Sequence, residues 1–441
     1  MSAVEARRGV GLALAALLWC VAVPVHAAPV RAWVDAVTGH RVVQISRTPG
    51  SSNLYFTQNA FTPQGDRMVI QVPEGIAVVT LGDWSVRLIV ADPNAHLLFM
   101  ARRHREAFFA SRGRDDAGGP FEVRAVDVDS GAVRRVAAVP GGTITSINAD
   151  DTRLVGIYAP PPASLNPDGT LRAPGQASNA IAGGNMYRER KRDGTFYTYA
   201  EAKTRALRRR LAARIPMELF TIDIATGART VVLRATDWLN HPQFSPTDPT
   251  LILYCHEGPW DEVDRIWLIH ADGTGNTLVH ARHMVGEIAG HEFFAPDGQT
   301  VWYDLQTPQG DVFWLAGYAI ATGRRTWYEV PRNQWSLHYN LSPDQTHFSG
   351  DGSDPGMVAH APDARYLYLF TPNPVAVAPV ASGSALIEPR TWSAEKLVSM
   401  AAADHTIEPN MVFTPDGHWA IFRASFGGGS QVYAVEVQNG K

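Results

Sequence analysis

The sequence predicts an all-β fold, a seven-bladed β-propeller with small helical insertions, and two features carry this prediction. A Phe/Leu-x-Pro turn recurs along the chain, at residues 61–63, 244–246, 294–296, 341–343 and 413–415. Copies that follow one another, such as Phe244 and Phe294, are about 50 residues apart, which is near the length of one four-stranded propeller blade. About seven such blades fit residues 28–441 once insertions are allowed for.

The turn residues within each repeat predict antiparallel hairpins. The copy from Phe413 to Phe422 begins Phe-Thr-Pro-Asp-Gly and continues into an apolar strand. Other copies end a second strand in a Gly-containing turn, as at Asp272-Gly273 and Ala321-Thr322-Gly323. Such turns between short alternating strands are typical of hairpins. We expect the strand Val42–Ile45 to complete the last blade, because closing the ring removes exposed sheet edges.

Composition indicates a folded protein without an internal disulfide. Hydrophobic residues make up 45% of the chain and charged residues 19%, which permits a packed core. The formal net charge of −4 argues against a general nucleic-acid binder. Beyond residue 27 the sequence contains a single cysteine, Cys255, which fits the bacterial periplasm better than a disulfide-stapled extracellular module.

Residues 1–27 have the features of a secretory signal peptide. Two arginines precede an apolar run at 10–23, and a Val-His-Ala sequence that resembles a cleavage site ends the segment. The run is short for a transmembrane helix, so we expect no stable membrane insertion. A lipoprotein anchored through Cys20 is the competing interpretation, which the bulky Trp19 disfavours. We therefore expect export to the periplasm and one mature domain, residues 28–441.

Two insertions interrupt the repeat. Residues 160–216 contain a loop rich in Pro, Gly and Asn, followed by a predicted basic helix. The helix is either a solvated surface helix or a basic flap that attracts an anionic ligand to one face of the ring. Its cationic residues are Lys203, Arg205, Arg208, Arg209, Arg210 and Arg214. Residues 372–403 are rich in Pro and Ala, and we expect them to end in a short helix.

The positions three residues before the repeated turns hold polar side chains of the kind that bind ligands. They are Gln58, His241, His291, His338 and Asn410. Side chains at one structural register of a closed repeat array converge on a shared axis. Three imidazoles and two carboxamides at that axis are hard to explain by packing. This register is the predicted site of chemistry.

A metal site is predicted close to the last of these positions. Glu408 and Asn410 are two residues apart and can share one face of a strand. Together with His405 and His338 they form a mixed nitrogen and oxygen donor set, which suits Mn²⁺, Zn²⁺ or another divalent ion. The alternative is a hydrogen-bonded network without a metal.

Residues 255–265 form another dense polar segment, with His256 near its start and Asp264-Arg265 at its end. A guanidinium group can bind a carboxylate through two parallel hydrogen bonds. Arg265 is therefore a candidate for binding an acidic ligand. The alternative is a structural Asp–Arg pair that ties hairpins together.

Several of these motifs together resemble the oligogalacturonate lyases, most strongly between Trp238 and Asp354. The motifs are His256-Glu257-Gly258-Pro259 with Asp264-Arg265, His291-Glu292-Phe293-Phe294, His338, and Gly350-Asp351-Gly352-Ser353-Asp354. The resemblance implies a seven-bladed propeller with a Mn²⁺ site that cleaves short oligogalacturonides by β-elimination. It also implies that His291 is the Brønsted base, that Arg265 neutralises charge near the base, and that His338 is the first metal ligand.

The remaining ligands of the family lie in a Gln-x-x-His-x-His stretch, and this chain departs from it with His405-x-x-Glu408-x-Asn410. The glutamate adds a negative charge, which reduces the positive charge presented to an anionic substrate. The predicted signal peptide is a second departure from the family pattern, because the family members that would be compared first are cytoplasmic. Four ligands remain: His338, His405, Glu408 and Asn410.

The expected function is a metal-dependent lyase that acts on short oligogalacturonides or related uronic-acid oligosaccharides and leaves 4,5-unsaturated products. Gln58, His241, His256 and Arg265 are assigned to substrate binding, and no residue is assigned to protonate the leaving oxygen. The alternative is a non-catalytic periplasmic propeller that binds uronides or a protein partner. A prolyl-oligopeptidase-like hydrolase has no support, because no Gly-x-Ser-x-Gly motif follows.

Overall fold

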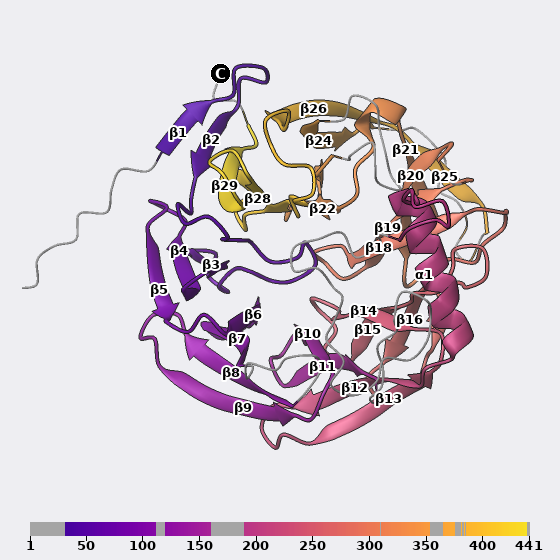
Figure 1. The fold of residues 1–441 in the computed structure, drawn as a ribbon, viewed down its shortest axis with the longest axis horizontal. Helices are drawn as coiled ribbons and strands as arrows, with labels where there is room; N and C mark the ends of the chain where they lie inside the picture. The colour runs from indigo at the N-terminus through magenta and orange to yellow at the C-terminus, as the bar shows by residue number, and fades with distance from the viewer. Residues whose placement is uncertain are drawn as a thin grey trace, which may run out of the picture.

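The computed structural model describes residues 31–111, 120–159, 189–308, 310–352, 365–374, 381, 383 and 385–438. Seven sheets are arranged in a ring around a central axis (Figure 1). The predicted seven-bladed all-β propeller is therefore confirmed. The predicted signal peptide, residues 1–27, lies outside the described residues.

The first three blades add their strands in chain order from the axis outwards (Figure 1). The innermost segment of blade one is irregular, and bridges join its Ser52 to Gln71 and its Phe61 to Met68. The strands of these blades are β3 (Arg67–Val72), β4 (Gly75–Thr80) and β5 (Val86–Val90); β6 (Ala95–Met100), β7 (Glu106–Ser111), β8 (Phe121–Asp127) and β9 (Val133–Val139); and β10 (Thr143–Ile147), β11 (Arg153–Tyr158), β12 (Met217–Asp223) and β13 (Arg229–Ala235).

Blades four to six repeat the pattern, and a short 3-10 helix, η1 (Arg332–Gln334), leads into blade six. A strand from a later part of the chain, β25 (Ile387–Arg390), adds to blade five by pairing in parallel with β21. The other strands are β14 (Leu239–Phe244), β15 (Leu251–His256), β16 (Ile266–His270) and β17 (Thr277–Leu278); β18 (Ile288–Phe294), β19 (Thr300–Gln306), β20 (Phe313–Ala319) and β21 (Arg325–Val330); and β22 (Tyr339–Leu341), β23 (Phe348–Gly350), β24 (Tyr366–Pro372) and β26 (Trp392–Ser399).

The seventh blade closes the ring with strands from both ends of the described chain. β27 (Val412–Phe413), β28 (Trp419–Ala424) and β29 (Gln431–Glu436) are followed outwards by β2 (Arg41–Gln44) and β1 (Arg31–Val34). β2 pairs with β29 through Val42↔Val435 and Val43↔Ala434. The expectation that the N-terminal strand completes the last blade is confirmed, and Figure 1 shows β1 and β2 beside β29.

One of the two helices predicted in the insertions is present and the other is absent from the described residues. The predicted basic helix is present as α1 (Tyr199–Ala213), and it begins with a capping box between Thr198 and Glu201. The prediction of a short helix near the end of residues 372–403 is wrong, because the described residues of that segment form β25 and β26. The Ala-Glu-Lys-Leu sequence within β26 favours a helix by propensity, but pairing with β24 outweighs that preference.

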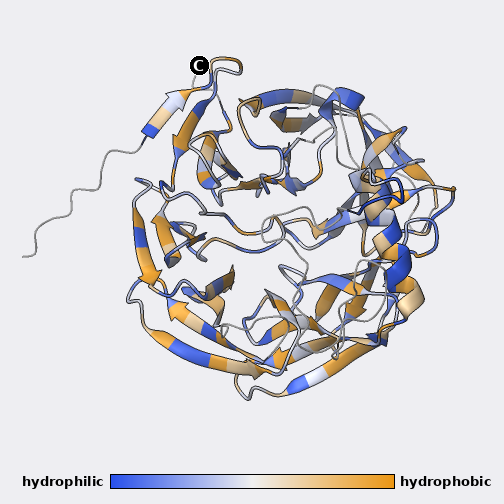
Figure 2. Ribbon diagram, in the orientation of Figure 1, coloured by the Kyte–Doolittle hydropathy of each residue, from blue (hydrophilic) through white to orange (hydrophobic). Residues whose placement is uncertain are grey.

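The core lies between neighbouring blades, where apolar faces of adjoining sheets meet. Leu219 of blade three and Tyr254 of blade four, for example, are both fully buried in one cluster. Figure 2 shows apolar positions alternating with polar ones along many strands, as expected where side chains point to opposite faces. Within the described part of the chain, no helix has both the length and the apolar character needed to cross a bilayer.

Candidate active site

Backbone irregularities direct the predicted register residues towards the axis. The pairing of β14 with β15 shifts between Asn240 and Gln243, and that of β18 with β19 shifts between Gly290 and Phe293. These two bulges contain His241 and His291, and both residues have a φ of 49°. Asn410, just before β27, has the same φ. Positive φ is uncommon for residues other than glycine, and bulges commonly re-aim side chains near active sites.

Each of the three histidines of the register is paired with a carboxylate through its Nδ1 atom. Because a carboxylate only accepts hydrogen bonds, Nδ1 carries the proton in the two close pairs, and Nε2 is left for other chemistry. The rings of His291 and His338 are 5.0 Å apart. The contacts are His291 Nδ1 to Asp304 Oδ2 at 3.0 Å, His338 Nδ1 to Asp351 Oδ2 at 2.6 Å, and His241 Nδ1 to Glu292 Oε1 at 3.6 Å.

A turn from blade one brings an aromatic pair to the same place. The ring of Tyr55 lies 5.4 Å from that of His338 and 6.3 Å from that of His241. The adjacent Phe56 ring is 4.9 Å from His338. Burial raises the pKa of Tyr55 well above its usual value, and the charges of four surrounding carboxylates raise it further, so the phenol remains protonated. Tyr55 is a central residue of the site that the sequence interpretation missed.

Gln58 stabilises this turn. Its Oε1 accepts a hydrogen bond from the backbone N–H of Tyr55 at 3.2 Å, and its own N–H donates to the carbonyl oxygen of Tyr55 at 2.8 Å. The predicted substrate-binding residue therefore lies in the turn that carries Tyr55. Its two hydrogen bonds with Tyr55 hold the turn of blade one that brings the Tyr55 ring to the site.

Asp351 connects blades six and seven beneath the histidines. Its Oδ1 accepts from the backbone N–H groups of Leu337 and His338, and its Oδ2 accepts from the backbone N–H of Asn410 at 3.3 Å. The Oδ1 atom of Asn410 accepts in turn from the N–H of Phe56 at 3.4 Å. Asp351, which belongs to one of the motifs of the resemblance, therefore positions two predicted metal ligands, His338 and Asn410.

The predicted metal ligands are brought together only in part. Burial lowers the pKa of His338, but the charges of Asp351, Glu408 and Asp304 outweigh it and the pKa is raised, so the carboxylate of Glu408 acts on this imidazole. His405 is half-buried in a turn that follows Asp404. Among the described residues, no three or more side chains of His, Cys, Asp or Glu form a group that could hold a metal ion.

The chemistry of this donor set nevertheless fits a divalent ion. A carboxylate that binds Nδ1 of a histidine is the usual outer partner of a metal-binding imidazole, and Asp351 has this relation to His338. Glu408, whose charge acts on His338, can supply oxygen donors, and Asn410 can supply a carboxamide oxygen.

Arg265 supplies a buried cation next to the histidines. Only 6% of its side chain is exposed, its Nη1 donates to the carbonyl oxygen of Gly258 at 2.9 Å, and its Nε has no hydrogen-bond partner among the described residues. Glu257 lies 3.9 Å from Nη2. An Arg with an unused buried donor is suited to bind a carboxylate.

The helix α1 brings a second cation to the site. Lys203 Nζ lies 5.6 Å from the ring centre of Trp260, which is nearly buried. Burial lowers the pKa of Lys203, while the charges of Glu257, Asp304 and Glu408 raise it, so this side chain is close to carboxylates of three blades.

The other cations of α1 are paired with acidic side chains. Arg208 binds Asp261, and Arg210 lies 3.8 Å from Glu257 and 4.4 Å from the ring centre of Trp238. The helix runs over the part of the ring formed by blades four and five (Figure 1). Neither sequence interpretation of α1 is complete, because the helix is anchored to blade four and its Lys203 lies close to the carboxylates of the site.

His256 is not brought to this cluster. Its Nδ1 lies 2.7 Å from Asp237 Oδ1, and its ring packs against Tyr254 and Trp267. The neighbouring Cys255 has the opposite orientation on β15, as strand alternation requires, and is influenced by the charges of Arg265, Glu292 and Glu257.

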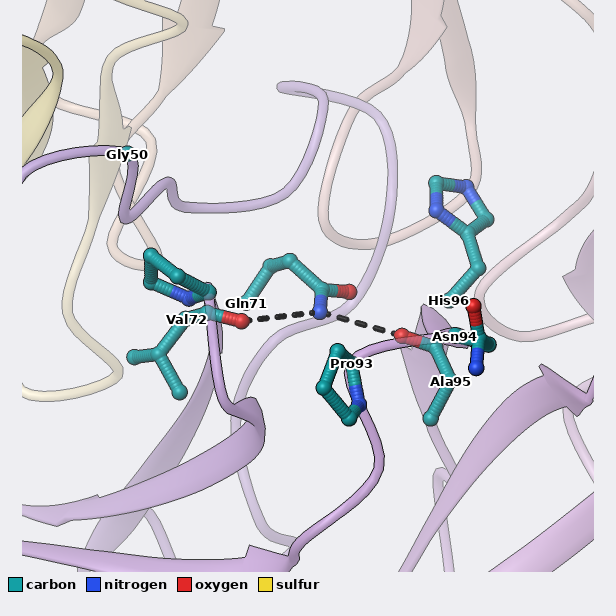
Figure 3. A pocket seen from close by; sticks show the side chains of 8 residues that line it. Gly50, Gln71, Val72, Pro93, Asn94, Ala95 and His96 are labelled. Atoms are coloured by element: carbon teal, nitrogen blue, oxygen red, sulfur yellow. Dashed lines mark hydrogen bonds between the residues drawn. The ribbon is translucent and has the colours of Figure 1, made fainter.

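A separate pocket lies between blades one and two (Figure 3). It is lined by Gly50, Gln71, Val72, Pro73, Pro93, Asn94, Ala95 and His96. The amide of Gln71 donates to the carbonyl oxygens of Val72 and Ala95, as the dashed lines in Figure 3 show, and its oxygen accepts from the N–H of Leu97. This amide joins the two blades, and the pocket contains none of the predicted site residues.

Comparisons with solved structures agree with the fold. An oligogalacturonate lyase in complex with manganese superposes with a TM-score of 0.71 at 21% identity, covering 93% of this chain and 97% of that one. The oligogalacturonate lyase from Vibrio parahaemolyticus gives a TM-score of 0.70 at 20% identity, covering 93% and 98%. These similarities establish the propeller architecture over nearly the whole chain.

Sequence comparisons identify the family. The oligogalacturonide lyase of Pectobacterium atrosepticum is 30% identical over 230 residues, which are 50% of this chain and 55% of that protein. The oligogalacturonate lyase of Dickeya dadantii is 42% identical over 86 residues, or 19% and 22% of the two chains. The matches thus span about half the length of the first relative and about a fifth of the second. The family model described as oligogalacturonate lyase matches residues 207–440, more than half of the sequence and most of the site above, and the chain therefore belongs to the oligogalacturonate lyase family.

Proposed function

We propose that this protein is a metal-dependent lyase that cleaves short oligogalacturonides, or related uronic-acid oligosaccharides, by β-elimination and leaves 4,5-unsaturated products. One observation carries the proposal: the imidazoles of His291 and His338, each paired with its own buried carboxylate, lie 5.0 Å apart near the buried Arg265. Family membership and the activity named for the relatives support it.

The base is His291. Asp304 accepts the proton of Nδ1 at 3.0 Å, which fixes the tautomer in which Nε2 carries a lone pair. That lone pair removes the proton from C5 of the uronide. Asp304 then stabilises the imidazolium that forms, as an orienting carboxylate does in other enzymes that use histidine as a base.

The substrate carboxylate controls the acidity of that proton. A proton next to an ionised carboxylate is weakly acidic, because its removal adds a second negative charge to the same group. Arg265 is buried and donates to Gly258, and its Nε has no hydrogen-bond partner in the described part of the chain, so it would bind this carboxylate and stabilise the developing charge. Lys203, close to Arg265, adds a second positive charge above the site.

The cofactor in this proposal is Mn²⁺ or another divalent ion, held by His338 and Glu408 with His405 and Asn410 as the further ligands. When bound, such an ion would withdraw charge from the substrate carboxylate. The relative solved in complex with manganese supports this identity.

The test compares the purified protein with two variants on trigalacturonate, with and without a chelator. Formation of the unsaturated product is followed by its ultraviolet absorbance, and the bound metal is measured by elemental analysis. We expect His291→Ala to abolish product formation while the metal content stays normal. We expect His338→Ala to lose both. Binding of trigalacturonate without cleavage by the wild-type protein would favour a non-catalytic uronide-binding propeller instead.

We also propose that residues 1–27 direct export to the periplasm, as the arginines and the apolar run of that segment suggest. The N-terminal sequence of the protein recovered from a periplasmic fraction tests this. A mature chain that begins at residue 28 supports it, whereas an intact residue 1 in the cytoplasmic fraction contradicts it.

A further inference from the structure

We propose that His241 is the general acid that protonates the leaving oxygen, and that Glu292 is the residue that positions it. The inference deepens the proposed function and rests on it, because elimination from a sugar needs a proton donor as well as a base. His291 and the predicted metal ligands leave that role unfilled.

The first observation is that His241 and His291 have equivalent places in neighbouring blades. Each lies in a bulge within the innermost strand of its blade, and each has a φ of 49°. The side chain of His241 is 29% exposed and that of His291 is 22% exposed. Two imidazoles therefore enter the same site from adjacent positions, with the ring of Tyr55 6.3 Å from His241.

The second observation is the state of Glu292. Its side chain has no exposed area, and neither carboxylate oxygen has a hydrogen-bond partner among the described residues. Burial of an unpaired carboxylate is strongly unfavourable, because the charge loses its hydration, unless a cation compensates it. His241 Nδ1 is 3.6 Å from Oε1, so a protonated His241 is a cation in position to do this.

The third observation is the balance of charges at His241. Burial lowers the pKa of this imidazole, but the nearby carboxylate of Glu292 and the charge of Glu257 outweigh burial and the charge of Arg265, and the pKa is raised. These charges come from β18, from the segment after β15 and from the segment before β16. A histidine with a raised pKa keeps its proton near neutral pH and can donate it, which is the property that a general acid needs.

The proposed step balances in atoms and electrons. Nε2 of His291 takes the proton from C5, and the electron pair of the C–H bond forms the C4–C5 double bond. The C4–O4 bond breaks with its electron pair on oxygen, and that oxygen takes the proton from Nε2 of His241. The step leaves His291 protonated and His241 neutral, and exchange with solvent restores both.

The main experiment uses two substrates that differ in their need for an acid. Trigalacturonate has a sugar alkoxide as leaving group, whereas a uronide with nitrophenolate at C4 has a leaving group that departs without protonation. We expect His241→Gln to lower kcat on trigalacturonate by about 10²- to 10⁴-fold, the usual contribution of a general acid, and to retain most of the rate on the nitrophenolate substrate. Equal losses on both substrates would overturn the assignment.

A pH profile tests the role of Glu292. Removing its charge with Glu292→Gln should move the alkaline limb of kcat/KM to lower pH by about 1 to 3 units, the range over which a nearby opposite charge shifts a pKa. The matched control is Asp237→Asn, which neutralises the carboxylate partner of His256 outside the cluster and should leave the profile unchanged. An unchanged limb in Glu292→Gln would contradict the positioning role.

NMR titration of the His241 ring gives a readout that does not depend on turnover or on the variants being active. Its resonance is identified by its loss in His241→Gln, and its titration should move to lower pH in Glu292→Gln. If the wild-type protein forms no unsaturated product at all, the proposed function fails. If it does form product but the nitrophenolate substrate shows no rescue, the acid assignment alone fails.

Discussion

Replacing Asp304 by asparagine tests whether His291 acts as a base in a fixed tautomer. Asp304 Oδ2 accepts from His291 Nδ1 at 3.0 Å, and the carboxylate is nearly buried on β19. An amide N–H at this place would donate to Nδ1, so the proton of the ring would move to Nε2, where the base needs a lone pair. Asparagine has nearly the same size and shape as aspartate, so the substitution changes the hydrogen-bonding groups at this place and leaves the packing unchanged.

The expected loss follows from the role of such a carboxylate. General-base catalysis contributes about 10²- to 10⁴-fold, which corresponds to about 3 to 5 kcal/mol of activation free energy. We therefore expect Asp304→Asn to lower kcat on trigalacturonate by that factor, with KM and metal content close to wild type. Ultraviolet absorbance of the unsaturated product measures kcat, and Asp237→Asn is again the matched control. A variant that keeps the wild-type kcat would refute the tautomer argument and with it the assignment of His291.

The remaining predictions concern the charges around blade four. Lys203→Met should raise KM for trigalacturonate about tenfold with little change in kcat, because it removes one charged contact to a bound anion. The control is Arg205→Met, which should change neither constant, because Arg205 is paired with Glu189. An unaltered KM in Lys203→Met would exclude contact between Lys203 and the substrate. Burial raises the pKa of Glu257, but His241, Arg265, Lys203 and Arg210 outweigh it and lower the pKa to about 2, below the ordinary value of 4.5. Because the folded-state pKa is depressed, this stabilisation of about 3 kcal/mol is present above pH 4.5 and is lost as the pH falls towards 2. Denaturant titrations between pH 6 and pH 3 should therefore show a smaller acid-induced loss of stability in Glu257→Gln than in wild type, and equal losses would contradict this assignment of charge.

Much of the architecture could be predicted because it repeats. The Phe-x-Pro turns gave the blade length, and the strand at Val42 could be assigned to ring closure from the general need to remove sheet edges. The same repeat aligns His241, His291 and His338 in the sequence, because a closed ring places equivalent positions at one axis. Because side chains alternate along a strand, Cys255 and His256 cannot face the same side of β15. In the structure Cys255 lies on the side of Arg265 and Glu257, and His256 pairs with Asp237 on the other side.

The residues that the sequence did not reveal depend on contacts between distant segments. Asp304 reaches His291 because Gly290 pairs with Asp304 across the β18–β19 hairpin, a register that turn chemistry alone does not specify. Tyr55 lies in an irregular segment of blade one, whose described length forms only isolated bridges. Lys203 reaches the site because Leu207 of α1 packs with Trp260 and Ile288, a tertiary contact that helix propensity does not encode.

The paired carboxylates distinguish the three register histidines, which are otherwise alike in position. The contact to Asp351 is short, and this carboxylate also accepts from two backbone N–H groups of the same turn, so the ring of His338 is held in one orientation, as the proposed metal ligand requires. Asp304 holds His291 through one oxygen and leaves the other without a partner among the described residues, which orients the ring without further constraint. Glu292 makes the longest contact, and its oxygens have no hydrogen-bond partner among the described residues, so its charge is available to a protonated His241. Asp304 and Asp351 each follow their histidine by 13 residues within one blade, whereas Glu292 reaches His241 from the neighbouring blade. In the proposed mechanism one repeated position supplies a ligand, a base and an acid, because the carboxylate beside each imidazole makes different contacts.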